Sequence, residues 1–388
     1  MNNRERFKAV AHFEKPYYMP IFGFQGSSLS LPPTDYVLDR LVATGMPAYV
    51  GRHKNGERDV ESWKDYWGTM GPTSLDFYIA SGMEGFKTTT RIENGYEITE
   101  SENGSIIRRQ MEGNTRAYGM PEFIKYPLTD RKSWEFYKSP TVPKTFMSKE
   151  EIEENCKRFD NRDYPLLINP GIRGYGDIRN LFGTENVSLI FYDDPELVQE
   201  ITDRALEYAR KYIFPLIERL KPEIVFKWED MCYNHGMLIS PEQFDKFFGQ
   251  GYREVCDCAA SSGVDMVAVD SDGNIMELTE IFSRYGVNGL FPCKVKASND
   301  LFTLRKKHQK FIFCGWLEKE VLNAGNANLI EKEIMDKAIP MMKEGYYFPN
   351  TDHSIQPLAT FENLCKFMTL LHDMCGNPEG KFPRMNLK

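Results

Sequence analysis

The sequence lacks the features of membrane, secreted and nucleic-acid-binding proteins. No run of about 18 apolar residues occurs in its 388 residues, which argues against a transmembrane helix. The opening residues Met-Asn-Asn-Arg-Glu-Arg-Phe-Lys contain no apolar signal core. Acidic residues (56) outnumber basic ones (48), and the net charge of -8 argues against a nucleic-acid partner. We therefore expect a cytoplasmic protein that binds neither a membrane nor a nucleic acid.

The chain also lacks a disulfide framework and a phosphate-binding glycine motif. Its eight cysteines are scattered, which is typical of reduced thiols in a large cytosolic protein. Cys256 and Cys258 lie in an expected helix, where a spacing of two sends the thiols to different faces, so we expect no metal clip there. Gly171-Ile-Arg-Gly-Tyr-Gly176 is glycine-rich but has the wrong spacing for a dinucleotide fingerprint, and we expect a loop turn.

A repeated pattern of apolar runs that end in polar residues dominates what is present. Ile224-Val-Phe-Lys-Trp-Glu-Asp-Met231 is a run of this kind, bounded by Pro222 and by a helix start at Ser240-Pro241. Such a run is typical of a buried parallel strand that delivers side chains to a site at its C-terminal end. Similar runs are Met266–Gly273, Gly289–Val295, Lys310–Lys319 and Tyr346–His353.

These strands alternate with helical segments from Tyr164 onward. Such alternation predicts a parallel sheet with crossover helices, and the number of repeats favours a closed (β/α)8 TIM barrel in one α/β domain, residues 1–388. An N-terminal helix at 3–14 and a strand at 19–24 come before the repeat. Further helices are expected at 35–44, 150–159, 195–220, 241–261, 275–285, 298–308, 328–344 and 359–374, and a strand at 166–171.

Residues 86–125 have a different pattern, that of an antiparallel meander. Asn94-Gly95 and Asn103-Gly104 are two-residue turn signals between alternating runs, which predict β-hairpins. We expect an inserted β-hairpin cover over the barrel. The nearby aromatic cluster from Trp63 to Gly68 is expected on irregular structure.

Carboxylates at the strand ends are the first candidates for chemistry. Glu229 and Asp230 follow one strand, and Asp270 and Asp272 the next, where alternate residues face the same side. They suit general acid or base catalysis or metal binding. The alternatives are a helix N-cap with a salt bridge for the first pair and a simple turn at Asp272-Gly273 for the second.

Asp352-His353 ends the last strand, where His353 suits a ligand or proton donor. Glu318 follows the seventh strand and would position a substrate or pair with Lys319. Cys293 and Cys314 are interpreted as buried structural thiols.

Several separated motifs resemble the uroporphyrinogen decarboxylase superfamily. They are Asn3-Arg-Glu-Arg-Phe-Lys-Ala-Val10, Trp228-Glu-Asp-Met231, Ile239-Ser-Pro-Glu242, Val269-Asp-Ser-Asp-Gly-Asn274, Gly315–Lys319 and Asp352-His353. The resemblance spans nearly the whole chain and implies a (β/α)8 barrel. The superfamily contains both decarboxylases and corrinoid-dependent methyltransferases, so the fold does not decide the function.

Two departures from the family patterns favour one branch. The segment Pro20–Gly26 has no arginine, although true decarboxylases resemble one another in an arginine-rich segment there. The zinc-binding His-x-Cys and Cys of coenzyme M methyltransferases are matched by Asp270-Ser-Asp272 and Asp352. The resemblance therefore implies a methyltransferase that moves a methyl group from a methoxylated, aromatic small molecule to the cobalt of a separate corrinoid protein. A lyase acting on a smaller carboxylic acid and a non-catalytic binding barrel remain alternatives.

The resemblance also implies the roles of individual residues. Zinc, or an acid, would activate the departing oxygen, and a homodimer is common in the family. The catalytic candidates are Glu229, Asp230, Asp272 and His353. The candidate metal ligands are Glu229, Asp270, Asp272, Glu318 and His353. The candidate substrate-binding residues are Lys227, Trp228, Tyr233 and Phe24.

Overall fold

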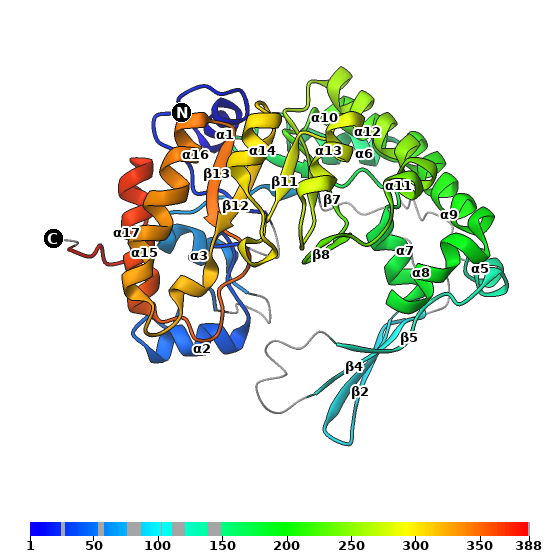
Figure 1. The fold of residues 1–388 in the computed structure, drawn as a ribbon, viewed down its shortest axis with the longest axis horizontal. Coiled ribbons are helices and arrows are strands. Elements are labelled where there is room, and N and C mark those ends of the chain that lie inside the picture. Colours follow the sequence, from blue (N-terminus) through cyan, green and yellow to red (C-terminus); the bar gives the residue numbers. More distant parts are fainter. Residues whose placement is uncertain are drawn as a thin grey trace.

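The core of the protein is a curled, wholly parallel sheet. The computed structural model describes residues 1–24, 28–52, 58–75, 87–101, 103–110, 121–138 and 149–386. Within these ranges the strands follow the order β1-β6-β7-β10-β11-β12-β13, and helices lie around the outside of the curl (Figure 1). The strands are β1 Thr73–Ser74, β6 Leu166–Ile168, β7 Ile224–Trp228, β10 Met266–Asp270, β11 Gly289–Phe291, β12 Ile312–Leu317 and β13 Tyr347–Thr351.

The expected closed barrel is found only in part, because the described strands form a TIM-like sheet whose ladder stays open. The segment expected as the first strand contributes one parallel bridge, between Phe22 and Met70. On its other side, Asn350 Nδ2 donates to the Phe22 carbonyl oxygen at 2.9 Å. A side chain therefore joins the first segment to β13 where a closed barrel has backbone hydrogen bonds. Gly23 fits here because an added Cβ would lie 2.7 Å from Asn350 Nδ2.

Helix α1 (Asn3–Ala11) packs against the interior cluster of the curled sheet. Asn2 and Glu5 form a capping box that fixes its start. Phe7 is fully buried, and its ring centroid lies 5.1 Å from those of both Phe22 and Phe348. This helix thereby closes one end of the interior with aromatic side chains.

The remaining helices mostly lie where the sequence predicts them. Three expected helices, at 195–220, 241–261 and 328–344, are interrupted: the first by the π-helical segment η1, the second between α11 and α12, and the third by the π-helical segment η4. The α-helices are α2 Asp35–Ala43, α3 Val60–Trp67, α5 Arg131–Lys138, α6 Lys149–Lys157, α7 Tyr175–Phe182, α8 Thr184–Asp193, α9 Pro195–Tyr208, α10 Phe214–Leu220, α11 Pro241–Phe247, α12 Gly249–Ser262, α13 Met276–Tyr285, α14 Leu301–Lys307, α15 Ala327–Glu333, α16 Ile339–Glu344 and α17 Phe361–Cys375. The 3-10 and π segments are η1 Ala209–Ile213, η2 Val295–Ala297, η3 Lys319–Leu322 and η4 Ile334–Ala338.

Two helical regions correct the sequence analysis. The aromatic cluster expected on irregular structure forms α3, because Asp59 caps its first turn and Gly68 ends it in the left-handed conformation. The glycine-rich segment expected as a turn leads directly into α7 and α8, which the sequence analysis did not predict. Neither of these, nor any other helix in the described ranges, combines the length and apolar character needed to cross a membrane.

Four antiparallel strands lie in the range of the expected meander. They are β2 Thr89–Glu93, β3 Tyr96–Glu100, β4 Ile106–Gln110 and β5 Glu122–Lys125. Asn94 and Gly95 both have positive φ (50° and 79°), as the two-residue turn between β2 and β3 requires. The sheet extends away from the parallel strands, next to α7 and α8 (Figure 1). Residues 86, 102 and 111–120 of the predicted meander lie outside the described residues.

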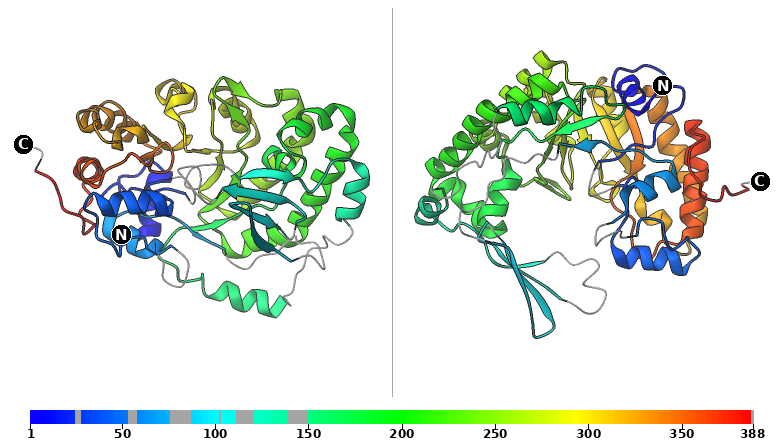
Figure 2. Two further views of the ribbon diagram at one scale, coloured as in Figure 1. Left: turned by 90° about the horizontal axis from the view of Figure 1, so that it is seen from below. Right: turned by 180° about the vertical axis from the view of Figure 1, so that it is seen from behind.

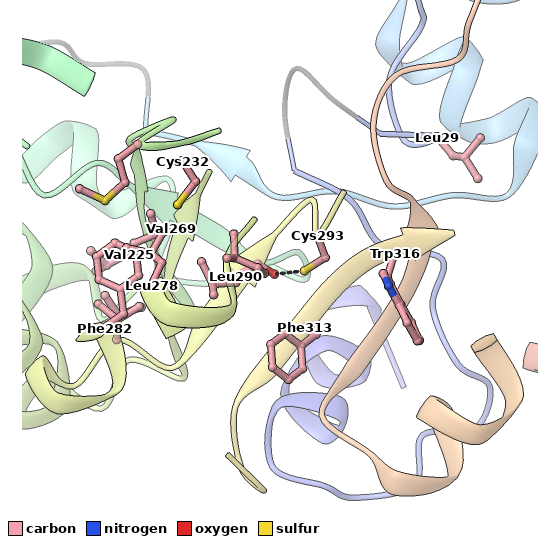
Figure 3. Close-up of a cluster of buried hydrophobic side chains, with 14 of the residues drawn as sticks. Leu29, Val225, Cys232, Val269, Leu278, Phe282, Leu290, Cys293, Phe313 and Trp316 are labelled. Carbon is pink, nitrogen blue, oxygen red and sulfur yellow. Dashed lines mark hydrogen bonds between the residues drawn. The ribbon is translucent and has the colours of Figure 1, made fainter. Parts of the chain in front are cut away.

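A second apolar cluster fills the space between the strands and the surrounding helices. Val225, Val269 and Leu290 point outward from successive strands, and Leu278 and Phe282 of α13 pack in the same cluster (Figure 3). The other views show the same curled arrangement and place both termini on one side, near α16 and α17 (Figure 2). The strands are therefore covered on both faces, which leaves their C-terminal ends for a site.

Candidate functional site

Three polar side chains from different strand ends meet at one carboxylate oxygen. Asp272 follows β10, Lys294 follows β11 and His353 follows β13. Lys294 Nζ lies 2.6 Å from Asp272 Oδ2, and His353 Nε2 lies 3.9 Å from the same oxygen. The three side chains are between 27% and 30% exposed, so they reach solvent. In parallel α/β barrels this end of the strands carries the chemistry.

A fully buried carboxylate holds the loops that carry these groups. Asp352 accepts hydrogen bonds from the Val295 amide at 2.9 Å and from the Lys319 amide at 3.1 Å, and Lys319 Nζ lies 3.4 Å away. Asn299 Nδ2 donates to the Lys294 carbonyl oxygen at 2.8 Å. The backbone on both sides of the Lys294 side chain is thereby fixed.

Asp270 is buried at the same end of β10. Its position alternates with Met266 and Ala268, which belong to the interior cluster, so its side chain faces the interior of the curl. Burial raises the pKa of Asp270 well above its ordinary value, and the carboxylates of Asp272 and Asp230 raise it further. This residue is therefore favoured as a neutral acid at the base of the site.

The imidazole of His353 is favoured in its neutral form. Burial lowers the pKa of His353, and the charges of Lys294 and Lys319 lower it further against the opposing effect of Asp272. A neutral imidazole can donate one hydrogen bond and accept another. His353 can therefore form hydrogen bonds of both kinds with a bound molecule.

Asp230 and Trp228 lie beside an arginine that the sequence analysis missed. Asp230 adopts φ 51°, a left-handed conformation, and its carboxylate accepts a hydrogen bond from Arg179 Nη2 at 3.0 Å. The Arg179 guanidinium also lies over the Trp228 ring, 5.3 Å from its centroid. This arginine comes from α7, a helix absent from the sequence-based prediction.

Lys227 and Glu229 face the helices instead of the interior. Lys227 is paired with Asp177 of α7. Glu229 is fully buried and accepts hydrogen bonds from Tyr252 Oη at 2.5 Å and from the Gly176 amide at 3.0 Å. Strand alternation explains this arrangement, because Lys227 and Glu229 follow Val225 on the outward side of β7. The structure does not bring either residue to Asp272.

The other three predicted residues contact groups other than the Asp272 side chain, although the backbone of Tyr233 lies near it: the Tyr233 carbonyl oxygen accepts from the Asn274 amide at 2.8 Å. Phe24 is fully buried, with its ring centroid 4.7 Å from that of the partly exposed Phe226, so it lies in the interior core. Tyr233 is half exposed on a short β-hairpin, β8 Cys232–Tyr233 and β9 Gly236–Met237, and its ring contacts His235. Glu318 caps the 3-10 segment η3, and burial raises its pKa.

The arrangement of these groups does not match a metal-binding set. Within the described ranges, no three His, Cys, Asp or Glu side chains are grouped so as to hold a metal ion. The Asp272 oxygen nearest His353 is occupied by the ammonium of Lys294. Zinc therefore stays a prediction from the resemblance, and we derive no chemical step through it.

Lys294 is the main residue at the site that the sequence analysis did not single out, and Lys319 was considered only together with Glu318. Both follow apolar runs that were recognised as strands, so the same pattern that selected Asp272 could have found them. Cys293, next to Lys294, and Cys314 on β12 are buried, as expected for structural thiols.

Comparisons with known proteins support the fold. No protein-family model matches the chain, and no curated protein matches it. Among solved structures, the chain is similar to a methyltransferase from Methanosarcina mazei, with a TM-score of 0.58 and 14% sequence identity, over 96% of this chain and 99% of the other. The chain thus shares the fold of a methyltransferase over its whole length. Membership of the uroporphyrinogen decarboxylase superfamily stays a prediction.

Proposed function

We propose that the protein is a methyltransferase that removes a methyl group from a methoxylated, aromatic small molecule and passes it to the cobalt of a separate corrinoid protein. The observation that carries the proposal is the partly exposed group of Asp272, Lys294 and His353 at the strand ends of a fold shared with a methyltransferase. Such a transfer requires a nucleophile from outside the chain, and the corrinoid of the partner supplies it when bound.

The residues of this chain would act on the departing oxygen. Displacement at the methyl carbon leaves a phenolate, which is a poor leaving group unless its oxygen is protonated or held by a cation. Asp270, favoured as a neutral acid, is the group here that can give a proton, neutral His353 can donate a hydrogen bond to the oxygen, and Asp272 positions Lys294. The partly exposed Trp228 and Phe226 offer aromatic surface for a substrate ring.

Methoxyaromatic turnover tests the proposal directly. The purified protein is mixed with a reduced corrinoid protein and a panel of methoxybenzenes, and release of the phenol is measured by chromatography. We expect turnover by the wild type and a loss of about 10²–10⁴-fold in Asp272→Asn. Asp257→Asn, an exposed position on α12, is the matched control and should keep full activity. Phenol release that is equally fast in Asp272→Asn would contradict the assigned site.

The proposal of zinc is tested by metal content, measured by elemental mass spectrometry on protein purified without chelators. The resemblance predicts about one zinc per chain, with three protein ligands and one open position, whereas the geometry of the described residues around Asp272 predicts none. Its loss in His353→Ala would assign the metal to this site. A protein that takes up no zinc after soaking would leave acid activation as the chemistry of the site.

A lyase acting on a small carboxylic acid is the second candidate. The ammonium groups of Lys294 and Lys319 lie at the same end of the sheet and suit a substrate carboxylate. This function predicts carbon dioxide release without any corrinoid. Release of labelled carbon dioxide from candidate acids, with no phenol formed from methoxybenzenes, would favour it over methyl transfer.

A further inference from the structure

The cation nearest the candidate site is a lysine of this chain. Lys294 Nζ has three N–H donors, and Asp272 Oδ2, at 2.6 Å, accounts for one of them. His353 Nε2 lies 3.9 Å from the same Asp272 oxygen. One ammonium and one imidazole thus meet at a single carboxylate oxygen.

Stability does not account for this ion pair. Both side chains are close to one third exposed, and exposed pairs of this kind contribute only about 0–1 kcal/mol. The other oxygen, Asp272 Oδ1, is buried and has no hydrogen-bond partner among the described residues. Buried polar atoms are normally satisfied, so the unmet Asp272 oxygen indicates a place for a hydrogen-bond donor of a ligand, and the remaining N–H groups of Lys294 suit an oxygen acceptor of the same ligand.

The backbone around Lys294 is held in place, and the ion pair with Asp272 positions the ammonium at the end of its side chain. The Val295 amide is bonded to Asp352 and the Lys294 carbonyl to Asn299. A fixed donor needs little rearrangement when charge develops next to it, which is the condition for strong electrostatic stabilisation.

We infer that Lys294 binds the oxygen of the scissile methyl ether and stabilises the negative charge that develops on it, with Asp272 positioning the ammonium. This inference rests on the proposed methyl transfer. In the step, the external nucleophile gives its electron pair to the methyl carbon. The carbon–oxygen pair passes to the oxygen, which leaves as a phenolate held by Lys294. The ammonium is the cation of this step.

A binding measurement tests the inference without turnover. 4-Nitrophenol is the probe, because its phenolate and neutral forms absorb at different wavelengths. We expect wild-type protein to bind it with an increase in the phenolate band, Lys294→Arg to retain part of that increase and Lys294→Met to lose it. Lys296→Met is the matched control, because Lys296 is 61% exposed and pairs with Glu320. A wild-type protein that leaves the phenolate band unchanged would overturn the inference.

Kinetics with two leaving groups give a second, distinguishable result. In Lys294→Met, demethylation of methoxybenzene should fall by about 10²–10³-fold. Demethylation of 4-nitroanisole should fall less, because its leaving oxygen carries less charge. An equal loss for both ethers, or no loss, would overturn the role of Lys294 while leaving methyl transfer itself in place. Absence of turnover in wild type, with nitrophenolate still bound, would overturn the proposed function but not the binding role of Lys294.

Discussion

Three buried carboxylates differ in charge because their partners differ. Glu223 accepts hydrogen bonds from Arg162 and the Leu166 amide; burial opposes ionisation, but these contacts outweigh it and lower its pKa. Burial raises the pKa of Glu229, which has a tyrosine and one amide as hydrogen-bond donors. Burial and two neighbouring carboxylates raise that of Asp270. The presence of Asp or Glu at a position in the sequence therefore does not reveal whether the side chain is charged in the folded protein or what role it has.

Glu229 should behave as a buried acid that supports structure. Because its pKa is raised on folding, the folded state holds the proton more tightly, and stability falls as the pH rises above the ordinary value of about 4.3. Gln mimics the protonated side chain, so the stability of Glu229→Gln relative to wild type should increase between pH 5 and pH 8. Urea unfolding at both values measures this, and a difference that does not change with pH would contradict it.

The truncation Glu229→Ala provides the comparison. It removes the acceptor of Tyr252 Oη and of the Gly176 amide. Each buried group left without a partner costs about 1–3 kcal/mol. Glu229→Ala should therefore be less stable than Glu229→Gln at every pH, as measured in the same urea titrations.

At the level of elements, α1 is held by charge as well as by its aromatic side chain. Arg4 of this helix and Arg162 both pair with Glu223, at 2.7 and 2.8 Å. Lys8 and His12 both lie within 3.0 Å of Asp265, which comes just before β10. The helix thus bridges the starts of β7 and β10 and connects strands that are distant from it in the sequence.

Removing the buried arginine should destabilise this end of the molecule strongly. In Arg162→Met, Glu223 stays buried with one partner fewer, and breaking a buried pair costs about 3–5 kcal/mol. Arg4 is about one third exposed, so Arg4→Met is the matched control and should cost at most about 1 kcal/mol. Chemical denaturation at pH 7 compares them, and equal losses would contradict this assignment.

The stability that the Arg162–Glu223 ion pair contributes changes with pH in the opposite direction to the contribution of Glu229. Because the pKa of Glu223 is lowered on folding, its stabilisation is present above about pH 4.3 and is lost as the pH falls through the lowered value. The difference between wild type and Arg162→Met should therefore shrink in acid.

For the whole molecule, one asparagine connects the two ends of the curled sheet. Asn350 is fully buried on β13; its Oδ1 accepts from the Leu29 and Thr351 amides, both at 2.8 Å, and its Nδ2 donates to the Phe22 carbonyl. One side chain therefore supplies the hydrogen-bond partner of three backbone groups.

Asn350→Ala should weaken the closure of the sheet. About 1–3 kcal/mol is expected for each buried backbone group left without a partner. Asn186→Ala, at an exposed position on α8, is the control and should stay within about 0.5 kcal/mol. Thermal unfolding measures both, and hydrogen exchange at Leu29 should accelerate in Asn350→Ala alone. An unchanged exchange rate would contradict the closing role.

The sequence by itself determined the alternating strands and helices, the antiparallel strands around Asn94-Gly95 and the placing of polar residues at strand ends. These features depend on local periodicity and turn chemistry, which the sequence carries directly. The sequence does not show which side of β7 each residue faces, and for this reason Glu229 was predicted to belong to the same site as Asp272. Only the tertiary structure separated them, brought Lys294 to Asp272 and left the sheet joined through Asn350, because those outcomes depend on contacts between segments far apart in the chain.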